Sequence, residues 1–136
     1  MPTVLTILPE GFEELEAVAP IDLLRRAGCV VTVAALGPTL RVTGRNALVL
    51  EADTLLADLV AGPQAPQIPN SKPQIPNSDA GPIINHKSEI IDSAVPLHDC
   101  LLLPGGPGVQ HLRASPAVRA LVARHHAAGS LLAAIC

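Results

Sequence analysis

The chain has 136 residues, 49% of them hydrophobic and 15% charged, with a net charge of −3, which fits one domain with an apolar core and excludes a disordered chain. Phe12 is the only aromatic residue among Phe, Tyr and Trp, and the net charge is negative, so the composition argues against nucleic-acid binding. No run is apolar and long enough to span a membrane, and no basic residues open a signal peptide, so we expect a cytoplasmic protein with reduced cysteines and no membrane partner.

The first 62 residues predict alternating strands and helices. The aliphatic and β-branched run Thr3–Leu8, which stops at Pro9, is typical of a buried strand. Apolar residues recur at helical spacing from Glu13 to Ala27, and we expect Pro20 to kink this helix or to start its second part, and Gly28 to end it. The elements expected next are a strand over 29–36, a hairpin of strands 40–43 and 47–50, and a helix over 53–60 capped by Asp53.

The last part of the chain predicts a strand over 99–103, a helix over 116–127 with Ser115 as its N-cap, and a strand over 130–135. Continuous apolar strands that alternate with helices indicate an α/β fold, a doubly wound parallel sheet covered on both faces. Such sheets bind ligands at the carboxyl ends of their strands, where residues 104–106 and Cys136 both fall. His125 and His126 end the predicted helix and are expected to form a surface pair that suits its dipole.

Residues 62–96 break this pattern, because they are rich in Pro, Asn, Ser and Gln. The hexapeptide PQIPNS occurs twice, at residues 66–71 and 73–78. Such a composition buries little apolar surface, so we expect an inserted, disordered surface loop within a single domain of residues 1–136. A peptide-docking role for the prolines is the alternative.

Three segments at strand ends offer reactive groups or backbone donors. Cys136 follows an apolar strand, as does the thiol of a nucleophile elbow, although a structural core cysteine has the same pattern. The turn Pro104-Gly105-Gly106 lets backbone N–H groups approach a ligand, as an oxyanion hole requires, although an ordinary strand-to-helix turn also favours glycine. The acidic stretch at residues 10–17 can place a carboxyl group beside the thiol, although acidic residues stabilise any helix N terminus.

Taken together, these segments resemble the ThiJ/PfpI family. The stretches that carry the resemblance are EGFEELEAVAPIDLLRRAG at 10–28, GRNALVL at 44–50, DCLLLPGG at 99–106 and AAIC at 133–136. The match is nearest to the protein deglycase branch of the family. It covers about residues 1–62 and 99–136 and leaves the repeat-bearing segment outside.

The resemblance implies a flavodoxin-like sandwich that forms a homodimer and needs no cofactor or metal. It implies a reactive thiol at Cys136, a proton partner at Glu16, and backbone donors at Gly105 and Gly106. It also implies that Arg45 lies close to the substrate and the dimer interface. The activities of the family are glyoxalase III-type hydration of small aldehydes such as methylglyoxal, removal of early glycation adducts from proteins, and redox-sensitive chaperone behaviour.

The sequence departs from the family pattern after Cys136, where the family continues with a turn and the elbow helix. No histidine of the sequence matches the family's histidine downstream of the cysteine. We therefore expect a chain that is truncated at the nucleophile and impaired as an enzyme. Three hypotheses stay open: a cysteine enzyme, a redox sensor or chaperone-like protein that does not catalyse a reaction, and an inactive fragment.

Overall fold

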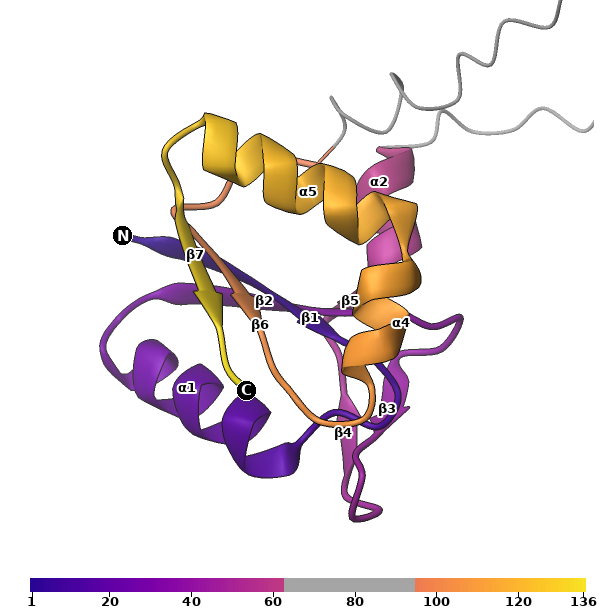
Figure 1. Cartoon of the computed structure of the whole chain (residues 1–136). Coiled ribbons are helices and arrows are strands. Elements are labelled where there is room, and N and C mark those ends of the chain that lie inside the picture. Colours follow the sequence, from indigo (N-terminus) through magenta and orange to yellow (C-terminus); the bar gives the residue numbers. More distant parts are fainter. Residues whose placement is uncertain (63–94) are drawn as a thin grey trace, which may run out of the picture.

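A five-stranded parallel sheet forms the centre of the structure, a computed structural model that describes residues 1–62 and 95–136 (Figure 1). In chain order its strands are β1 (Thr3–Leu8), β2 (Val30–Ala35), β5 (Thr54–Leu55), β6 (Cys100–Leu103) and β7 (Leu131–Ala134). They lie in the order β5-β2-β1-β6-β7, and every neighbouring pair is parallel. All strands therefore end at the same edge, and the predicted parallel sheet is confirmed.

Helices cover both faces of this sheet (Figure 1). Helix α1 (Glu14–Arg26) packs on one face through Ala17 and Ile21, which share a buried cluster with side chains of β1, β2 and β6. The other face carries the helices α2 (Leu56–Ala61), α4 (Val109–Ala114) and α5 (Pro116–Ala127). The doubly wound α/β arrangement predicted from the alternation of strands and helices is thus confirmed. Within the described residues, no helix is long and apolar enough to cross a membrane.

The ends of α1 follow from local sequence. Glu13 is the N-cap, and its side chain accepts a hydrogen bond from the N–H of Glu16 at 2.9 Å. The helix runs without a break through Pro20 and ends at Arg26, and Gly28 follows the C-cap with a φ of +87°. Because a left-handed residue after the C-cap favours glycine, Gly28 ends the helix as expected.

Helix α5 begins where the sequence predicts, whereas α4 was not expected. The hydroxyl of Ser115 accepts the N–H of Val118 at 3.3 Å, and Pro116 is the first helical residue. Helix α4 has only six residues, and no side chain caps its N terminus at Gly108. A helix this short shows too little periodicity for sequence reasoning to detect.

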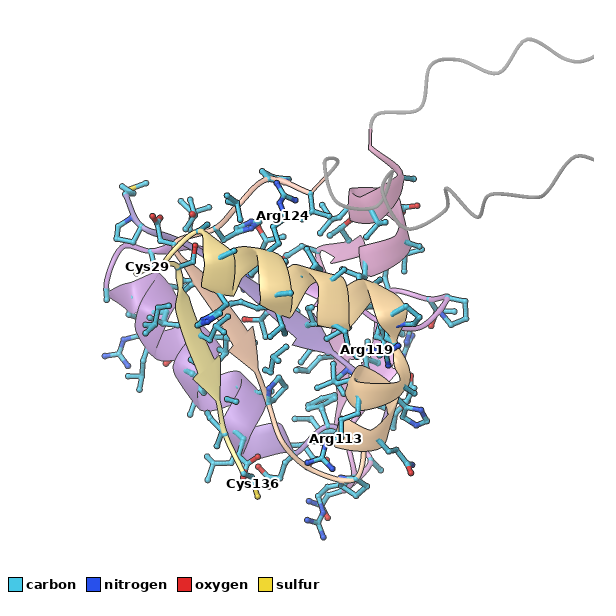
Figure 2. All side chains as sticks on the ribbon, turned by 45° about the horizontal axis from the view of Figure 1, so that its top comes forward. Cys29, Arg113, Arg119, Arg124 and Cys136 are labelled. Atoms are coloured by element: carbon cyan, nitrogen blue, oxygen red, sulfur yellow. The ribbon has the colours of Figure 1, made fainter. Side chains whose placement is uncertain are left out.

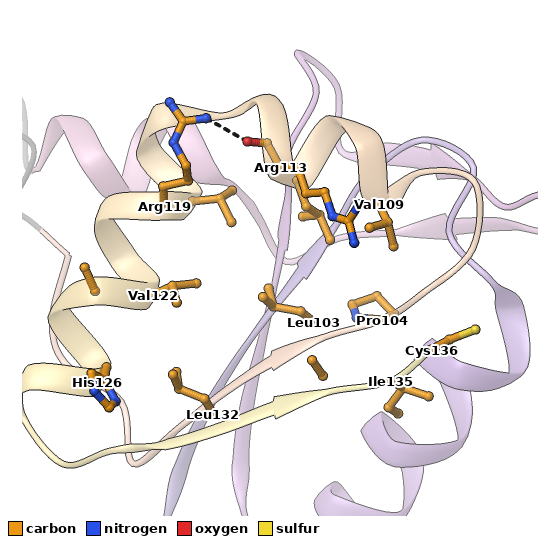
Figure 3. A pocket seen from close by; sticks show the side chains of 14 residues that line it. Leu103, Pro104, Val109, Arg113, Arg119, Val122, His126, Leu132, Ile135 and Cys136 are labelled. Carbon is orange, nitrogen blue, oxygen red and sulfur yellow. Dashed lines mark hydrogen bonds between the residues drawn. The ribbon is translucent and has the colours of Figure 1, made fainter.

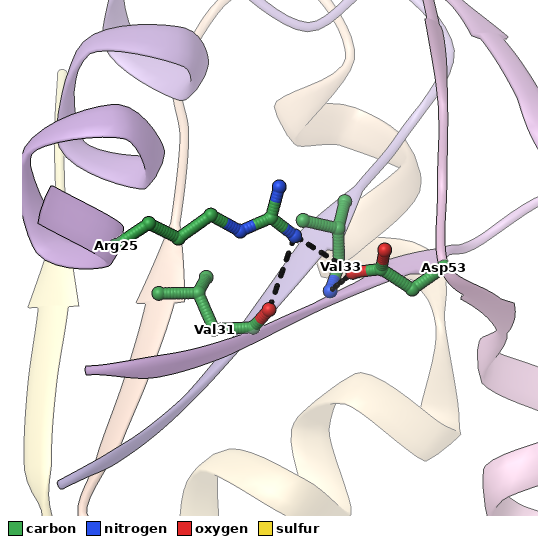
Figure 4. A network of polar contacts seen from close by, with 4 residues as sticks. All are labelled: Arg25, Val31, Val33 and Asp53. Atoms are coloured by element: carbon green, nitrogen blue, oxygen red, sulfur yellow. Dashed lines mark hydrogen bonds and ion pairs between the residues drawn. The ribbon is translucent and has the colours of Figure 1, made fainter. Parts of the chain in front are cut away.

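Asp53 has a different role from the predicted helix cap. Residues 54–55 form β5, and α2 starts at Leu56 without a side-chain cap. The Asp53 carboxylate instead accepts the N–H of Val33 at 2.7 Å and pairs with Arg25 at 3.0 Å (Figure 4). Arg25 also donates to the carbonyl of Val31 at 3.1 Å, so these polar contacts fasten the end of α1 to β2.

The predicted hairpin is present and packs against the segment that follows β1. Its strands, β3 (Arg41–Thr43) and β4 (Val49–Glu51), form a separate antiparallel pair. The N–H of Gly11 donates to the carbonyl of Thr43 at 2.8 Å, and the Glu14 carboxylate accepts the backbone N–H of Asn46 at 2.5 Å. The hairpin is therefore held at the carboxyl edge of the sheet.

The segment predicted to be a disordered loop, residues 62–96, lies mostly outside the described residues, including both PQIPNS copies. At its end, Val95 is buried in the same cluster as Leu101 and Leu121. The guanidinium of Arg124 donates to the carbonyl of Val95. Val95 is therefore packed against the described part of the fold and bound to α5.

Candidate active site

Three loops meet at the carboxyl edge of the sheet, after β1, β6 and β7. The C-terminal end of the chain lies beside the start of α1 (Figure 1). The N–H of Glu13 donates to the carbonyl of Gly105 at 2.9 Å, which joins the loop after β1 to the loop after β6. The N–H of Ile135 donates to the carbonyl of Leu103 at 3.1 Å, so the loop after β6 also lies beside the end of β7.

Cys136 is exposed at this edge and carries a free thiol. Its φ is +73°, in the left-handed region that residues other than glycine seldom adopt. A strained backbone at the reactive residue, directly after a strand, is also typical of a nucleophile elbow. Figure 2 shows Cys29 at the opposite end of the molecule from Cys136.

The side chains of Glu16 and Cys136 converge on the Cα of Gly105. A carboxylate oxygen of Glu16 accepts the N–H of Gly105 at 3.0 Å. A Cβ added to Gly105 would come within 3.0 Å of that oxygen, of the Cβ of Cys136 and of the carbonyl oxygen of Ile135. The carboxylate and the cysteine therefore lie against the same Cα atom, and only glycine fits between them.

The two glycines predicted as backbone donors differ in what their N–H groups do. The N–H of Gly105 is engaged by Glu16. Gly106 has a φ of +97°, and its N–H makes no hydrogen bond to any described residue. Of the two, the N–H of Gly106 is therefore the one that is free to bind a ligand.

Arg45 lies on the turn between β3 and β4 and is exposed. Its backbone N–H donates to the carbonyl of Phe12 at 2.9 Å. Among the described residues, no hydrogen bond or ion pair connects its guanidinium to Glu16, Gly105 or Cys136. The structure thus brings together the other predicted site residues and leaves Arg45 on the adjacent hairpin.

An apolar groove of about 460 Å³ opens beside Cys136, between α4 and α5 on one side and β6 and β7 on the other (Figure 3). Its floor includes Leu103 and Leu132, and Arg113 and His126 lie at its rim. Leu132 is 38% exposed and its neighbour Leu131 is 66% exposed. Sequence reasoning missed the groove, because it exists only where the unexpected helix α4 packs beside α5.

Cys100, His98 and His125 lie toward the opposite edge, where strands β1 and β6 begin. Burial, together with the neighbouring thiol of Cys29, raises the pKa of the Cys100 thiol, which suits a structural cysteine. His125 is fully buried, so the predicted surface pair is wrong: its Nε2 accepts the N–H of His98 at 3.2 Å. Within residues 1–62 and 95–136, no three His, Cys, Asp or Glu side chains gather as metal ligands.

The chain is similar to a family of known proteins over nearly its whole length. Residues 2–136 match the model of the DJ-1/PfpI family. The Parkinson disease protein 7 homolog of Danio rerio is 33% identical over 133 residues, which are 97% of this chain and 53% of that protein. Protein DJ-1 homolog A of Arabidopsis thaliana is 33% identical over 135 residues, which are 98% of this chain and 26% of that protein.

Solved structures also match the whole length of this chain, at sequence identities close to those of the relatives above. Oxidized DJ-1 of Toxoplasma gondii has a TM-score of 0.71 and 30% identity, and the match covers 100% of this chain and 56% of that one. A DJ-1 superfamily protein from Salmonella typhimurium has a TM-score of 0.70 and 31% identity, with coverage of 100% and 56%. The chain therefore spans about half the length, or less, of these relatives.

Proposed function

The chain belongs to the DJ-1/PfpI family, as its sequence motifs indicate, and we propose that it is a cofactor-independent cysteine enzyme of the glyoxalase III or deglycase type. Its substrates would be small reactive aldehydes or early glycation adducts. The observation that carries the proposal is that the Glu16 carboxylate and the side chain of Cys136, whose thiol is free, converge on the Cα of Gly105. We place the activity in the cytoplasm, where thiols stay reduced.

The proposed reaction begins with the Cys136 thiolate. The thiolate sulfur adds to the aldehyde carbon of an α-oxoaldehyde, and the carbonyl electron pair moves to the oxygen, which takes up a proton to give a hemithioacetal. The free N–H of Gly106 donates to that oxygen while its negative charge develops.

Glu16 performs the proton transfer that follows. Its carboxylate removes the proton from the former aldehyde carbon and returns it to the adjacent ketone carbon, which is reduced while the aldehyde carbon is oxidised to a thioester. Water then attacks the thioester, the carbon–sulfur bond breaks, and a 2-hydroxy acid and the free thiol are released. The net reaction adds one water to the substrate and needs no outside oxidant or reductant.

The test is the reaction of residues 1–136 with methylglyoxal, followed by mass spectrometry of the Cys136 adduct and by lactate release. Because Glu16 already occupies the N–H of Gly105, and one oxyanion donor is worth about 100-fold to 1000-fold in rate, we expect slow turnover. Cys136→Ser should abolish both signals, and Glu16→Gln should keep the adduct but lower lactate release. Lactate release that persists in Cys136→Ser would refute the proposal, and so would a chain that forms neither adduct nor lactate.

A redox sensor or chaperone-like binder is the second candidate, because an exposed thiol lies at the end of an apolar groove. Oxidation of Cys136 to a sulfenic or sulfinic acid would add a polar group at the groove mouth. Peroxide treatment should then change the ability of the chain to suppress aggregation of an unfolded client, and Cys136→Ser should remove the peroxide dependence. A chain inactive in both assays would support the inactive-fragment hypothesis.

We also propose that two copies associate as a homodimer. The support is a set of exposed apolar side chains on α1 and the hairpin, Leu15, Val18, Leu48 and Val49. These two elements adjoin, because the Glu14 carboxylate accepts hydrogen bonds from the backbone and the side chain of Asn46. Sedimentation equilibrium should give a dimer that dissociates in Val18→Asp, and a chain that stays monomeric at high concentration would contradict this.

A further inference from the structure

Helix α1 starts with half of a capping box. In a complete box the N-cap side chain accepts the N–H of the third helical residue, and the side chain of that residue accepts the N–H of the N-cap. Glu13 is the N-cap and Glu16 is the third helical residue. The first bond is present, because Glu13 Oε2 accepts the N–H of Glu16 at 2.9 Å.

In place of the second bond, the backbone of Gly105 bridges Glu13 and Glu16. The N–H of Glu13 donates to the carbonyl of Gly105 at 2.9 Å, and the N–H of Gly105 donates to the carboxylate of Glu16 at 3.0 Å. Glu13, Glu16 and Gly105 thus form a closed hydrogen-bond ring of three bonds. Glu16 and Gly105 are 89 residues apart in sequence, so the ring fastens the start of α1 to the end of β6.

This opened box changes the direction of the Glu16 side chain. In a complete box its carboxylate would turn back onto the N terminus of its own helix. Here the carboxylate reaches across to Gly105, where it and the Cβ of Cys136 crowd the same Cα atom. The position of Glu16 therefore depends on a helix that starts in the correct place, and Glu13 sets that start.

We propose that Glu13 is a positioning residue, which holds the Glu16 carboxylate beside Cys136 through the hydrogen-bond ring. The inference rests on the proposed function for its catalytic consequence, but the ring itself can be tested without activity. Glu13 does not donate or accept a proton in the reaction. Its carboxylate is bound to the backbone of Glu16, and no bond from it to Cys136 occurs among the described residues.

The first test is amide hydrogen exchange of residues 1–136, followed by NMR. In Glu13→Ala the N–H groups of Glu16 and Gly105 should exchange about fivefold faster, the equivalent of the roughly 1 kcal/mol that an N-cap contributes. The N–H groups of Leu5 and Ile7 in the buried strand β1 should keep their rates. Glu13→Gln retains an oxygen that can accept the same bond, and it should restore slow exchange.

Glu14→Ala is the matched control, because this neighbouring carboxylate binds Asn46 on the hairpin and takes no part in the ring. It should leave the exchange of Gly105 unchanged. An equal acceleration of all amides in Glu13→Ala would show a general loss of stability and overturn the proposal. Unchanged exchange at Gly105 in Glu13→Ala would overturn it as well.

The second test uses the methylglyoxal reaction. Glu13→Ala should lower lactate release toward the level of Glu16→Gln while the Cys136 adduct forms at an unchanged rate, and Glu13→Gln should recover at least half of the release. If Glu13→Ala releases lactate like the unaltered chain, Glu13 does not position Glu16 for the reaction. If the unaltered chain releases none, the proposed function fails, and the exchange experiment still decides whether the ring exists.

Discussion

Replacing Gly105 by alanine tests how closely Glu16, Ile135 and Cys136 are packed. The added Cβ would lie less than 3.0 Å from a Glu16 carboxylate oxygen, from the carbonyl oxygen of Ile135 and from the Cβ of Cys136. The Glu16 side chain can move away, but the Ile135 oxygen belongs to a backbone that is hydrogen-bonded to Leu103. The substitution must therefore displace either the end of β7 or the loop after β6.

Two effects set the size of the loss. An extra methyl group in a packed site costs about 1–3 kcal/mol. If Glu16 moves, its hydrogen bond to the N–H of Gly105 is lost, and a bond to a charged group contributes about 1.5–3 kcal/mol, which we halve because this one is partly exposed. We expect Gly105→Ala to lower the free energy of unfolding by about 2–4 kcal/mol.

Urea unfolding followed by circular dichroism measures this loss. Gly37→Ala is the control, because a Cβ at Gly37 meets no atom within 4 Å, and its free energy should change by less than about 0.5 kcal/mol. The Gly105→Ala chain should also react with methylglyoxal at Cys136 at a different rate, since the thiol is displaced. A Gly105→Ala chain as stable as Gly37→Ala would refute the packing described at this edge.

Three further predictions concern other parts of the molecule. Asp53→Ala removes an acceptor for the backbone of β2 and should lower the free energy of unfolding by about 1 kcal/mol. Asp22→Ala breaks only an exposed ion pair and should change this free energy by less than about 0.5 kcal/mol, so equal shifts of the urea midpoint in the two variants would contradict the prediction. Burial and the neighbouring His125 imidazole lower the pKa of His98 below 6.5, so the unfolded chain binds a proton at this residue more readily than the folded chain, and stability should fall as the pH drops below about 6.5. The urea midpoints at about pH 7.5 and 5.5 should therefore differ less in His98→Asn than in the unaltered chain. Iodoacetamide should modify Cys136 before Cys100, because Cys136 is exposed while burial raises the pKa of Cys100, and mass spectrometry showing the reverse order would contradict this.

Local sequence signals predicted the parts of the fold that depend on neighbouring residues. The apolar run of β1 and the Ser115-Pro116 start of α5 each carry their signal within a few residues. Asp53 shows the limit of this reasoning. Its carboxylate could cap a helix or accept a hydrogen bond from a neighbouring strand, and only the position of β2 decides between the two. A strand as short as β5 carries no pattern that would have favoured the second use.

The candidate site was predicted by resemblance more than by pattern. Spacing and composition could place Cys136 and Gly105 at strand ends, but they could not choose Glu16 from the acidic residues of the first helical turn. Helix N-terminal acidity accounts for the acidic stretch at residues 10–17 without giving Glu13 a role of its own. Its bond to Gly105 joins residues that are far apart in the sequence, and only the folded chain reveals such a bond.

The strand order has a consequence for how the site assembles. Residues 3–35 form a β-α-β unit whose contacts are close in sequence, while β6 and β7 join it across one ladder, from Val4 opposite Cys100 to Thr6 opposite Leu102. Proteins open in cooperative units of this kind well below the free energy of complete unfolding. Glu16 belongs to the first unit, and Gly105 and Cys136 belong to the second. An opening of the β1–β6 ladder would therefore separate the carboxylate from the thiol while the first unit stays folded, and the exchange rate of the Gly105 amide would report how often this happens.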